Sequence, residues 1–103
     1  MIAVHPQIIY NPPAMPRITF TPHLKRHVDC PNEAVTGSTV RDALDAYFAV
    51  HPKVRSYVFD EQGALRRHVI VFVDSEQLKD RDKQSDAVGD QTELYVLQAL
   101  SGG

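Results

Sequence analysis

Only one stretch of this chain carries a helical pattern of apolar residues, and it lies between runs that favour strands. Between Val40 and Phe48 the apolar residues fall at i, i+3, i+4, i+7 and i+8, which gives a helix with one apolar face. Ser38 or Thr39 can cap its start, and Pro52 ends it. A single amphipathic helix must bury this stripe, so we expect it to cover one face of a β-sheet. The stripe consists of Val40, Ala43, Leu44, Tyr47 and Phe48.

The strands of this sheet are predicted from runs of β-branched and aromatic residues between turn signals. A strand is expected over residues 65–73, in the centre of the sheet after a turn at residues 60–63, because HVIVFVD at residues 68–74 is the most strand-like run of the chain. Residues 75–91 are polar and charged, so we expect a solvated surface loop with room for one short helical turn. The other strands are expected at residues 17–21, 27–30, 54–59 and 92–97, with a turn near residues 22–26.

The expected order of elements is strand, strand, helix, strand, strand, loop, strand. A right-handed crossover after the second strand would place the last strand beside the first. This is the β-grasp, or ubiquitin-like roll: an α+β fold in which one main helix packs on one face of a mixed sheet of four to five strands. We expect three parts: a proline-rich extension over residues 1–16, which hold four of the seven prolines, the β-grasp domain over 17–98, and a flexible tail over 99–103.

Composition excludes several classes of function. A chain of 103 residues suits one small domain, and its net charge of -2 gives no global basic field for nucleic acid or anionic lipid. No apolar run approaches the roughly 20 residues that span a bilayer, and no secretion-signal pattern begins the chain. Cys30 is the single cysteine, so no internal disulfide forms, and we expect a small buried side chain there. We therefore expect a cytoplasmic protein that binds neither nucleic acid nor membrane.

No constellation of catalytic residues is visible. The five histidines show no metal-ligand spacing, and no acid–base pair, nucleophile triad or phosphate-binding glycine loop occurs. We expect no catalytic residue, no metal and no bound cofactor. Arg66 and Arg67 form a small basic patch that offers one contact to a partner. The histidines are His5, His23, His27, His51 and His68.

The chain stops at LQALSGG, and this end is unusual. Glycine gains nothing by packing and loses more backbone entropy on ordering than any other residue. Either the end is inert, or the terminal carboxylate is itself the working group. The tail alone does not decide between these two explanations.

Four short motifs follow one another along the chain. They are a helix start at Gly37 to Leu44, a central strand at Val71 to Asp74, a turn into the last strand at Gly89-Asp90 with Leu94, and a terminal Gly102-Gly103. With these motifs in this order on a β-grasp, the chain resembles, over about residues 17–103, the MoaD/ThiS family of small sulfur-carrier proteins.

The resemblance implies a function for the tail. An E1-like enzyme would use ATP to adenylate the Gly103 carboxylate, which would then become a thiocarboxylate. A downstream synthase would take its sulfur for molybdopterin, thiamine or cysteine synthesis. Leu100, Ser101 and Gly102 would thread the active site of the partner, and the body would dock through Leu97, Ala99, Arg66 and Arg67.

The chain would then be a co-substrate and not a catalyst. Two alternatives stay open. A ubiquitin-like modifier would undergo the same activation and form isopeptide bonds with lysines. A β-grasp binding module would leave the tail unused.

Overall fold

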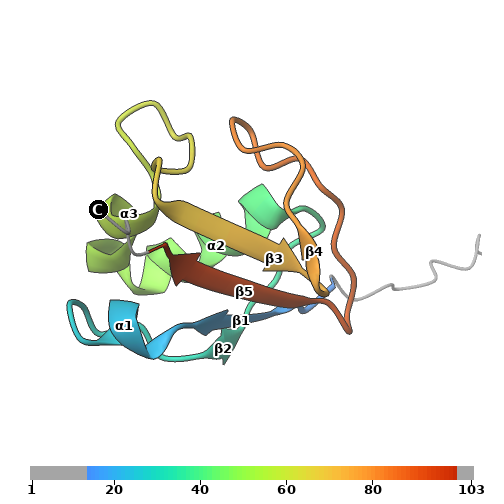
Figure 1. The fold of residues 1–103 in the computed structure, drawn as a ribbon. Helices are drawn as coiled ribbons and strands as arrows, with labels where there is room; N and C mark the ends of the chain where they lie inside the picture. Colours follow the sequence, from blue (N-terminus) through green and yellow to red (C-terminus); the bar gives the residue numbers. More distant parts are fainter. Residues whose placement is uncertain (1–13, 100–103) are drawn as a thin grey trace, which may run out of the picture.

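Five strands form a mixed sheet in the computed structural model, which describes residues 14–99 (Figure 1). The strand order is β2-β1-β5-β3-β4; β1 and β5 are parallel, and the other neighbours are antiparallel. The prediction of a β-grasp roll with the last strand beside the first is confirmed. The elements are β1 (Arg17–Phe20), α1 (Pro22–Lys25), β2 (Glu33–Ala34), α2 (Val40–Val50), α3 (Pro52–Val58), β3 (Val69–Val73), β4 (Glu76–Gln77) and β5 (Glu93–Gln98).

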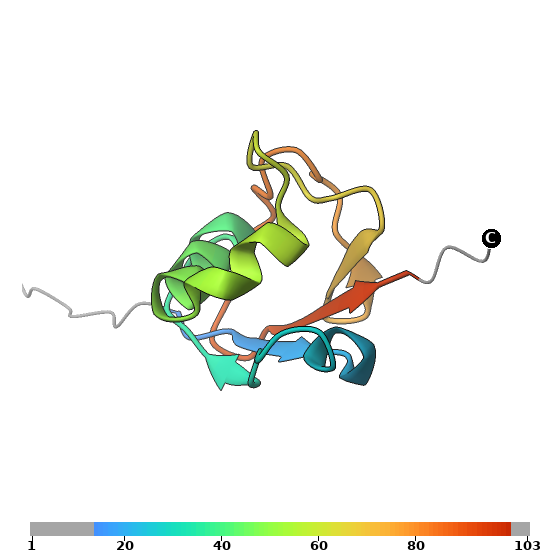
Figure 2. The same ribbon diagram turned by 90° about the vertical axis from the view of Figure 1, so that its left-hand side faces the viewer.

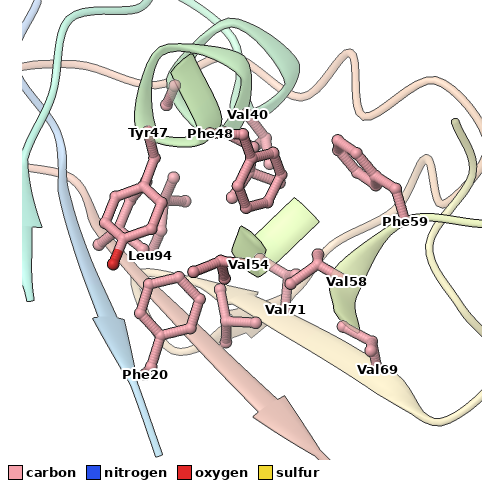
Figure 3. Packing of buried hydrophobic residues seen from close by; sticks show 14 of the residues in the cluster. Phe20, Val40, Tyr47, Phe48, Val54, Val58, Phe59, Val69, Val71 and Leu94 are labelled. Atoms are coloured by element: carbon pink, nitrogen blue, oxygen red, sulfur yellow. The ribbon is translucent and has the colours of Figure 1, made fainter. Parts of the chain in front are cut away.

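Helix α2 covers one face of the sheet, as its apolar stripe predicts (Figures 1 and 2). The Thr39 side chain accepts a hydrogen bond from the Asp42 amide at 3.1 Å and so caps the helix start. All five residues of the stripe are buried, and the Tyr47 and Phe20 ring centroids lie 5.0 Å apart (Figure 3). Tyr47 keeps its hydroxyl satisfied by donating to the Pro31 carbonyl at 2.7 Å. Among residues 14–99 no helix has both the length and the apolar character needed to cross a membrane.

The segment between β1 and α2 differs from the prediction. The expected turn near residues 22–26 is helix α1, and the expected strand at residues 27–30 is wrong, because the second strand is β2. Pro22 stands at the first turn of α1, where its missing N–H costs nothing. Leu24 anchors the helix in the core, and its carbonyl accepts from the amides of His27 and Val28, so these residues continue the turn.

The hairpin expected between residues 54–59 and 65–73 is also wrong, because its first arm is helix α3. Val54 and Val58 are both fully buried. Their spacing of four residues places both side chains on the same face of a helix. Pro52 begins this helix after ending α2. The predicted turn at residues 60–63 is present, with Gly63 at φ 81°.

Residues 75–91 are not simply solvated. They contain the short strand β4, and both Leu78 and Gln84 are buried. The Gln84 side chain accepts from Arg41 Nη1 at 3.1 Å and donates to the Arg81 carbonyl at 2.6 Å. A buried amide with both ends hydrogen-bonded is stable, and it fixes the polar segment to α2.

The same segment closes the outer edge of β3. The Leu78 amide donates to the Val71 carbonyl at 2.8 Å, which extends the pairing with β4 by one residue. Arg81 then replaces a strand partner, because its guanidinium donates to the carbonyls of Val69 and Arg66 at 2.8 and 2.9 Å. The carbonyl groups left open by the short β4 therefore have donors.

The residues just before β1 are joined to the domain. The carbonyls of Ala14 and Pro16 accept from the amides of Gly37 and Val35 at 3.0 and 2.9 Å. The remainder of the predicted extension, residues 1–13, lies outside the described residues.

Gly37→Ala is expected to destabilise the domain by about 1–3 kcal/mol, the usual cost of overpacking. A Cβ on Gly37 would stand 2.6 Å from the Ala43 backbone nitrogen, so the start of α2 would have to move. Gly89→Ala is the matched control, because its Cβ would meet only Thr92 Oγ1 at 3.9 Å. Urea unfolding of both variants measures the difference, and equal midpoints would contradict the predicted clash.

Candidate functional site at the end of the central strand

The last strand carries the chain out of the middle of the sheet. β5 pairs with β1 on one side and β3 on the other, so both of its edges are hydrogen-bonded. Its final residue, Gln98, lies opposite Val69, and the Ala99 amide still donates to the His68 carbonyl at 2.6 Å. The backbone is therefore fixed by the sheet up to four residues before the terminus. The predicted tail residues Leu100, Ser101, Gly102 and Gly103 lie outside the described residues.

Beside this exit, the sheet face opposite α2 carries apolar side chains, which we call the outer face patch. Leu97 lies opposite Ile70, and Tyr95 lies opposite Phe72. Ile70, Phe72 and Leu97 are half-buried and Tyr95 is 40% exposed, although their neighbours Val71 and Val96 are fully buried. Directly opposite side chains of a sheet touch, so the four form one continuous surface. An exposed apolar surface of this kind is typical of an interaction site.

Sequence reasoning placed only Leu97 of this patch in the docking surface. It missed Ile70, Phe72 and Tyr95. The signal was the run VIVFV, apolar at every position, which is typical of a strand with apolar side chains on both faces. Because α2 covers one face, the alternate residues of that run are left on the other. Ala99 follows directly on β5 and is half-buried.

Arg66 and Arg67 are both exposed, but the structure separates their contacts. Arg66 is tied to helix α3, because its Nε donates to the Ser56 carbonyl and its amide to the Val58 carbonyl. The Arg67 side chain makes no hydrogen bond or ion pair within residues 14–99, so it is the better candidate for a partner contact.

Cys30 is buried, with 2% of its surface exposed, so the expectation of a small core side chain is confirmed. It lies in the loop before β2 and not on a strand. Burial raises the pKa of the Cys30 thiol, and the nearby Lys25 ammonium offsets this only in part. A protonated, inaccessible thiol is a poor nucleophile. This side chain is therefore unsuited to nucleophilic chemistry in the folded chain.

The four histidines between residues 14 and 99 are not gathered into one site. The rings of His23 and His27 stack edge-on at 5.0 Å, and His51 Nε2 lies 2.8 Å from Glu33 Oε2. Within the part of the chain that the structure describes, no three His, Cys, Asp or Glu side chains are grouped to hold a metal ion.

A mixed sheet with this strand order, one long helix across a single face and a chain end leaving the central strand defines a ubiquitin-like β-grasp protein. Comparison with known proteins gives the same class. No protein-family model matches the chain. Small archaeal modifier protein 1 of Haloferax volcanii is 36% identical over 70 residues, which are 64% of this chain and 71% of the relative.

Solved structures extend the match. The crystal structure of the Haloferax volcanii protein has a TM-score of 0.74 at 27% identity, covering 87% of this chain and 100% of that chain. A chain of the Amycolatopsis orientalis BexX/CysO complex has a TM-score of 0.72 at 22% identity, covering 85% of this chain and 99% of that chain. At this lower identity the likeness is one of fold.

The chain belongs to the family of small archaeal modifier protein 1. The resemblance to ubiquitin-like proteins of the MoaD/ThiS type, noted from the sequence, is confirmed.

The Cys30 thiol is expected to react with a disulfide reagent far more slowly in the folded chain than in denaturant, because it is buried and protonated. Release of the coloured thiolate measures both rates. A Cys30→Ala, Ala49→Cys chain, whose thiol would stand at an exposed position of α2, is the matched control and should react rapidly when folded. A rapid reaction of folded Cys30 would show that the site opens.

Proposed function

We propose that this chain is a sulfur carrier whose Gly103 carboxylate is activated by an E1-like enzyme and converted to a thiocarboxylate. The observation that carries the proposal is the exit of the chain from the central strand. β5 is held on both sides, and only Leu100-Ser101-Gly102-Gly103 follow the last described residue, Ala99. Such a body presents a short terminal segment from a rigid base. The diglycine end and the family membership support the same function.

The chemistry requires activation because a carboxylate is charged and resonance-stabilised, and so is a poor electrophile. A Gly103 carboxylate oxygen would attack the α-phosphorus of ATP, and pyrophosphate would leave. Hydrosulfide would then attack the acyl carbon of the adenylate, AMP would leave, and the terminal thiocarboxylate would form. ATP is bound and used by the activating enzyme, and this chain supplies only the acyl group. A downstream synthase would then take up the sulfur, in molybdopterin, thiamine or cysteine synthesis.

Glycine suits the last two positions for a steric reason. Without Cβ atoms, Gly102 and Gly103 let a narrow active site close around bare backbone and leave the carbonyl open to attack. Ordering the tail costs roughly 1–2 kcal/mol per residue, which contacts elsewhere must offset. The outer face patch lies next to the exit and can provide them. It would dock a partner protein; the match to a chain of the BexX/CysO complex supports this, because that structure contains a β-grasp protein in a complex.

A second function has its own support. The relative from Haloferax volcanii is named a modifier protein, which favours transfer of the activated glycine to an amine. The adenylate is shared by both functions. They differ in the nucleophile that attacks the acyl carbon, which is sulfide for the carrier and a lysine amine for the modifier.

Incubation with ATP, sulfide and the activating enzyme of the same organism is expected to replace one oxygen of Gly103 by sulfur. Intact mass measures the gain, and the mass of the C-terminal peptide locates it. Deletion of Gly103 should abolish the gain, while Gly102→Ala should slow it without unfolding the domain. A Cys30→Ala background excludes a side-chain persulfide. Thiolation of the shortened chain would contradict the proposal, and isopeptide conjugates without thiocarboxylate would favour the modifier.

Leu97→Asp is expected to raise the KM of the chain in adenylation by about tenfold, or about 1.4 kcal/mol, because a charge placed in an apolar contact loses its hydration without a compensating partner. Its side chain belongs to the outer face patch, so the fold should survive. Val50→Asp is the matched control, because it places the same charge on a residue that is 67% exposed at the end of α2. Pyrophosphate exchange measures KM, and equal values for the two variants would exclude docking through this patch.

A further inference from the structure

Positive charge gathers in three segments of the chain that contain no Asp or Glu. These segments are residues 22–28, 52–58 and 64–69, and we call their Lys and Arg side chains the basic collar. All of these side chains belong to exposed residues. The basic collar consists of Lys25, Arg26, Lys53, Arg55, Arg66 and Arg67.

The topology brings these segments to the end of the molecule where the tail leaves. Residues 64–69 reach the exit directly, because the His68 carbonyl accepts from the Ala99 amide. α1 follows β1, which runs parallel to β5, and the Thr21 amide at its start donates to the Val96 carbonyl at 3.1 Å. Figure 1 shows α1, α3 and the end of β5 at the same end of the molecule.

Contacts also link the three segments to one another. The Arg66 amide donates to the Val58 carbonyl in α3 at 2.9 Å. The Tyr57 hydroxyl of α3 donates to the His27 carbonyl, after α1, at 3.3 Å. The three segments that carry the basic collar are therefore in contact with one another.

No side chain of the basic collar forms an ion pair within the described residues, where the close contacts of basic with acidic side chains join Arg41 with Asp45 and His51 with Glu33. Asp60 and Glu61 lie beside Arg66, in the same surface pocket, and offset part of its charge.

The opposite end of the sheet has the other sign, because Asp74, Glu76 and Glu93 lie there, at the turn from β3 to β4 and at the start of β5. The middle of the polar segment instead lies beside residues 64–69, where the Leu65 amide donates to the Arg81 carbonyl. A net charge of -2 therefore conceals a molecule with a positive end and a negative end.

We propose that the basic collar docks on an acidic protein surface around the active-site entrance of the activating enzyme. The inference rests on the proposed function and adds the chemistry of the partner surface. Complementary charge raises the rate of productive encounter, and opposite signs at the two ends of the chain orient it. An acidic partner surface attracts the end that carries the tail and repels the acidic end. The chain would thus arrive with its C-terminus leading.

Charge reversal at each end tests the proposal with an identical change in net charge. Lys25→Glu with Arg67→Glu alters the basic collar at two positions without hydrogen-bonded side chains in the described structure. Arg17→Glu with Lys79→Glu makes the same change in charge away from the basic collar, since Arg17 is exposed and lies opposite Glu93 at the acidic end of the sheet. The assay is pyrophosphate exchange with the activating enzyme of the same organism, over a range of salt concentrations. Melting temperatures confirm that both variants are folded.

The collar variant is expected to raise KM about tenfold at low salt, with kcat unchanged, since rim charges act mainly on association. The difference in KM between the collar variant and the unaltered chain should become smaller as the salt concentration rises, because salt screens the interactions of exposed charges. The KM of the acidic-end variant should stay within about twofold of the KM of the unaltered chain, because the position of the charges and not the net charge determines binding.

Three outcomes would overturn the inference. Equal KM values for the two variants would mean that the basic collar has no special role, while the proposed function would stand. Loss of binding to total transfer RNA in the collar variant alone, with unchanged exchange, would assign the collar to nucleic acid. No exchange with the unaltered chain, using an enzyme active on another carrier, would overturn the proposed function and this inference with it.

Discussion

The parallel pairing of β1 with β5 is the contact on which the rest of the molecule depends. It joins residues 17–20 to residues 93–96, so nearly the whole chain must fold between the two strands. Ile18, Phe20, Leu94 and Val96 from this pair are all buried on the side covered by α2. The crossover through α2 is what makes a parallel pair possible. Because β5 is both central and last, the same pairing sets the place and direction in which the chain leaves the sheet.

The elements that could be predicted are those in which the spacing of apolar residues fits either a helix or a strand, but not both. The stripe of α2 matches a helix at five positions, and the run VIVFV favours a strand. The segment VRSYVF is ambiguous, because Val54 and Val58 fit a helix while Val54, Ser56 and Val58 also fit an alternating strand. Tertiary packing favours the helix, because the helix buries both Val54 and Val58 against the core. The two-residue strand β2 is too short to leave any periodicity in the sequence.

The site was predicted unevenly for a related reason. The diglycine end is contiguous in the sequence, so it was visible at once. The outer face patch combines β3 with β5, and the basic collar combines three distant segments. The basic collar could not be predicted from composition. A net charge of -2 excludes a positive field around the whole molecule, but it does not show whether positive charge gathers at one end. Arg66 and Arg67 were recognised as a pair, whereas Lys25 and Lys53 acquire meaning only through the topology.

Arg81 has a consequence for how this protein can be recognised at all. Many partners of small sheet proteins bind by adding a strand to an open edge. Here the guanidinium of Arg81 occupies the Val69 and Arg66 carbonyls, and β4 covers the remainder of that side. A side chain thus takes the place that an incoming backbone would need. The molecule is protected there against edge-to-edge pairing with its own copies. On this side of the sheet, partners must therefore recognise the surface through its side chains.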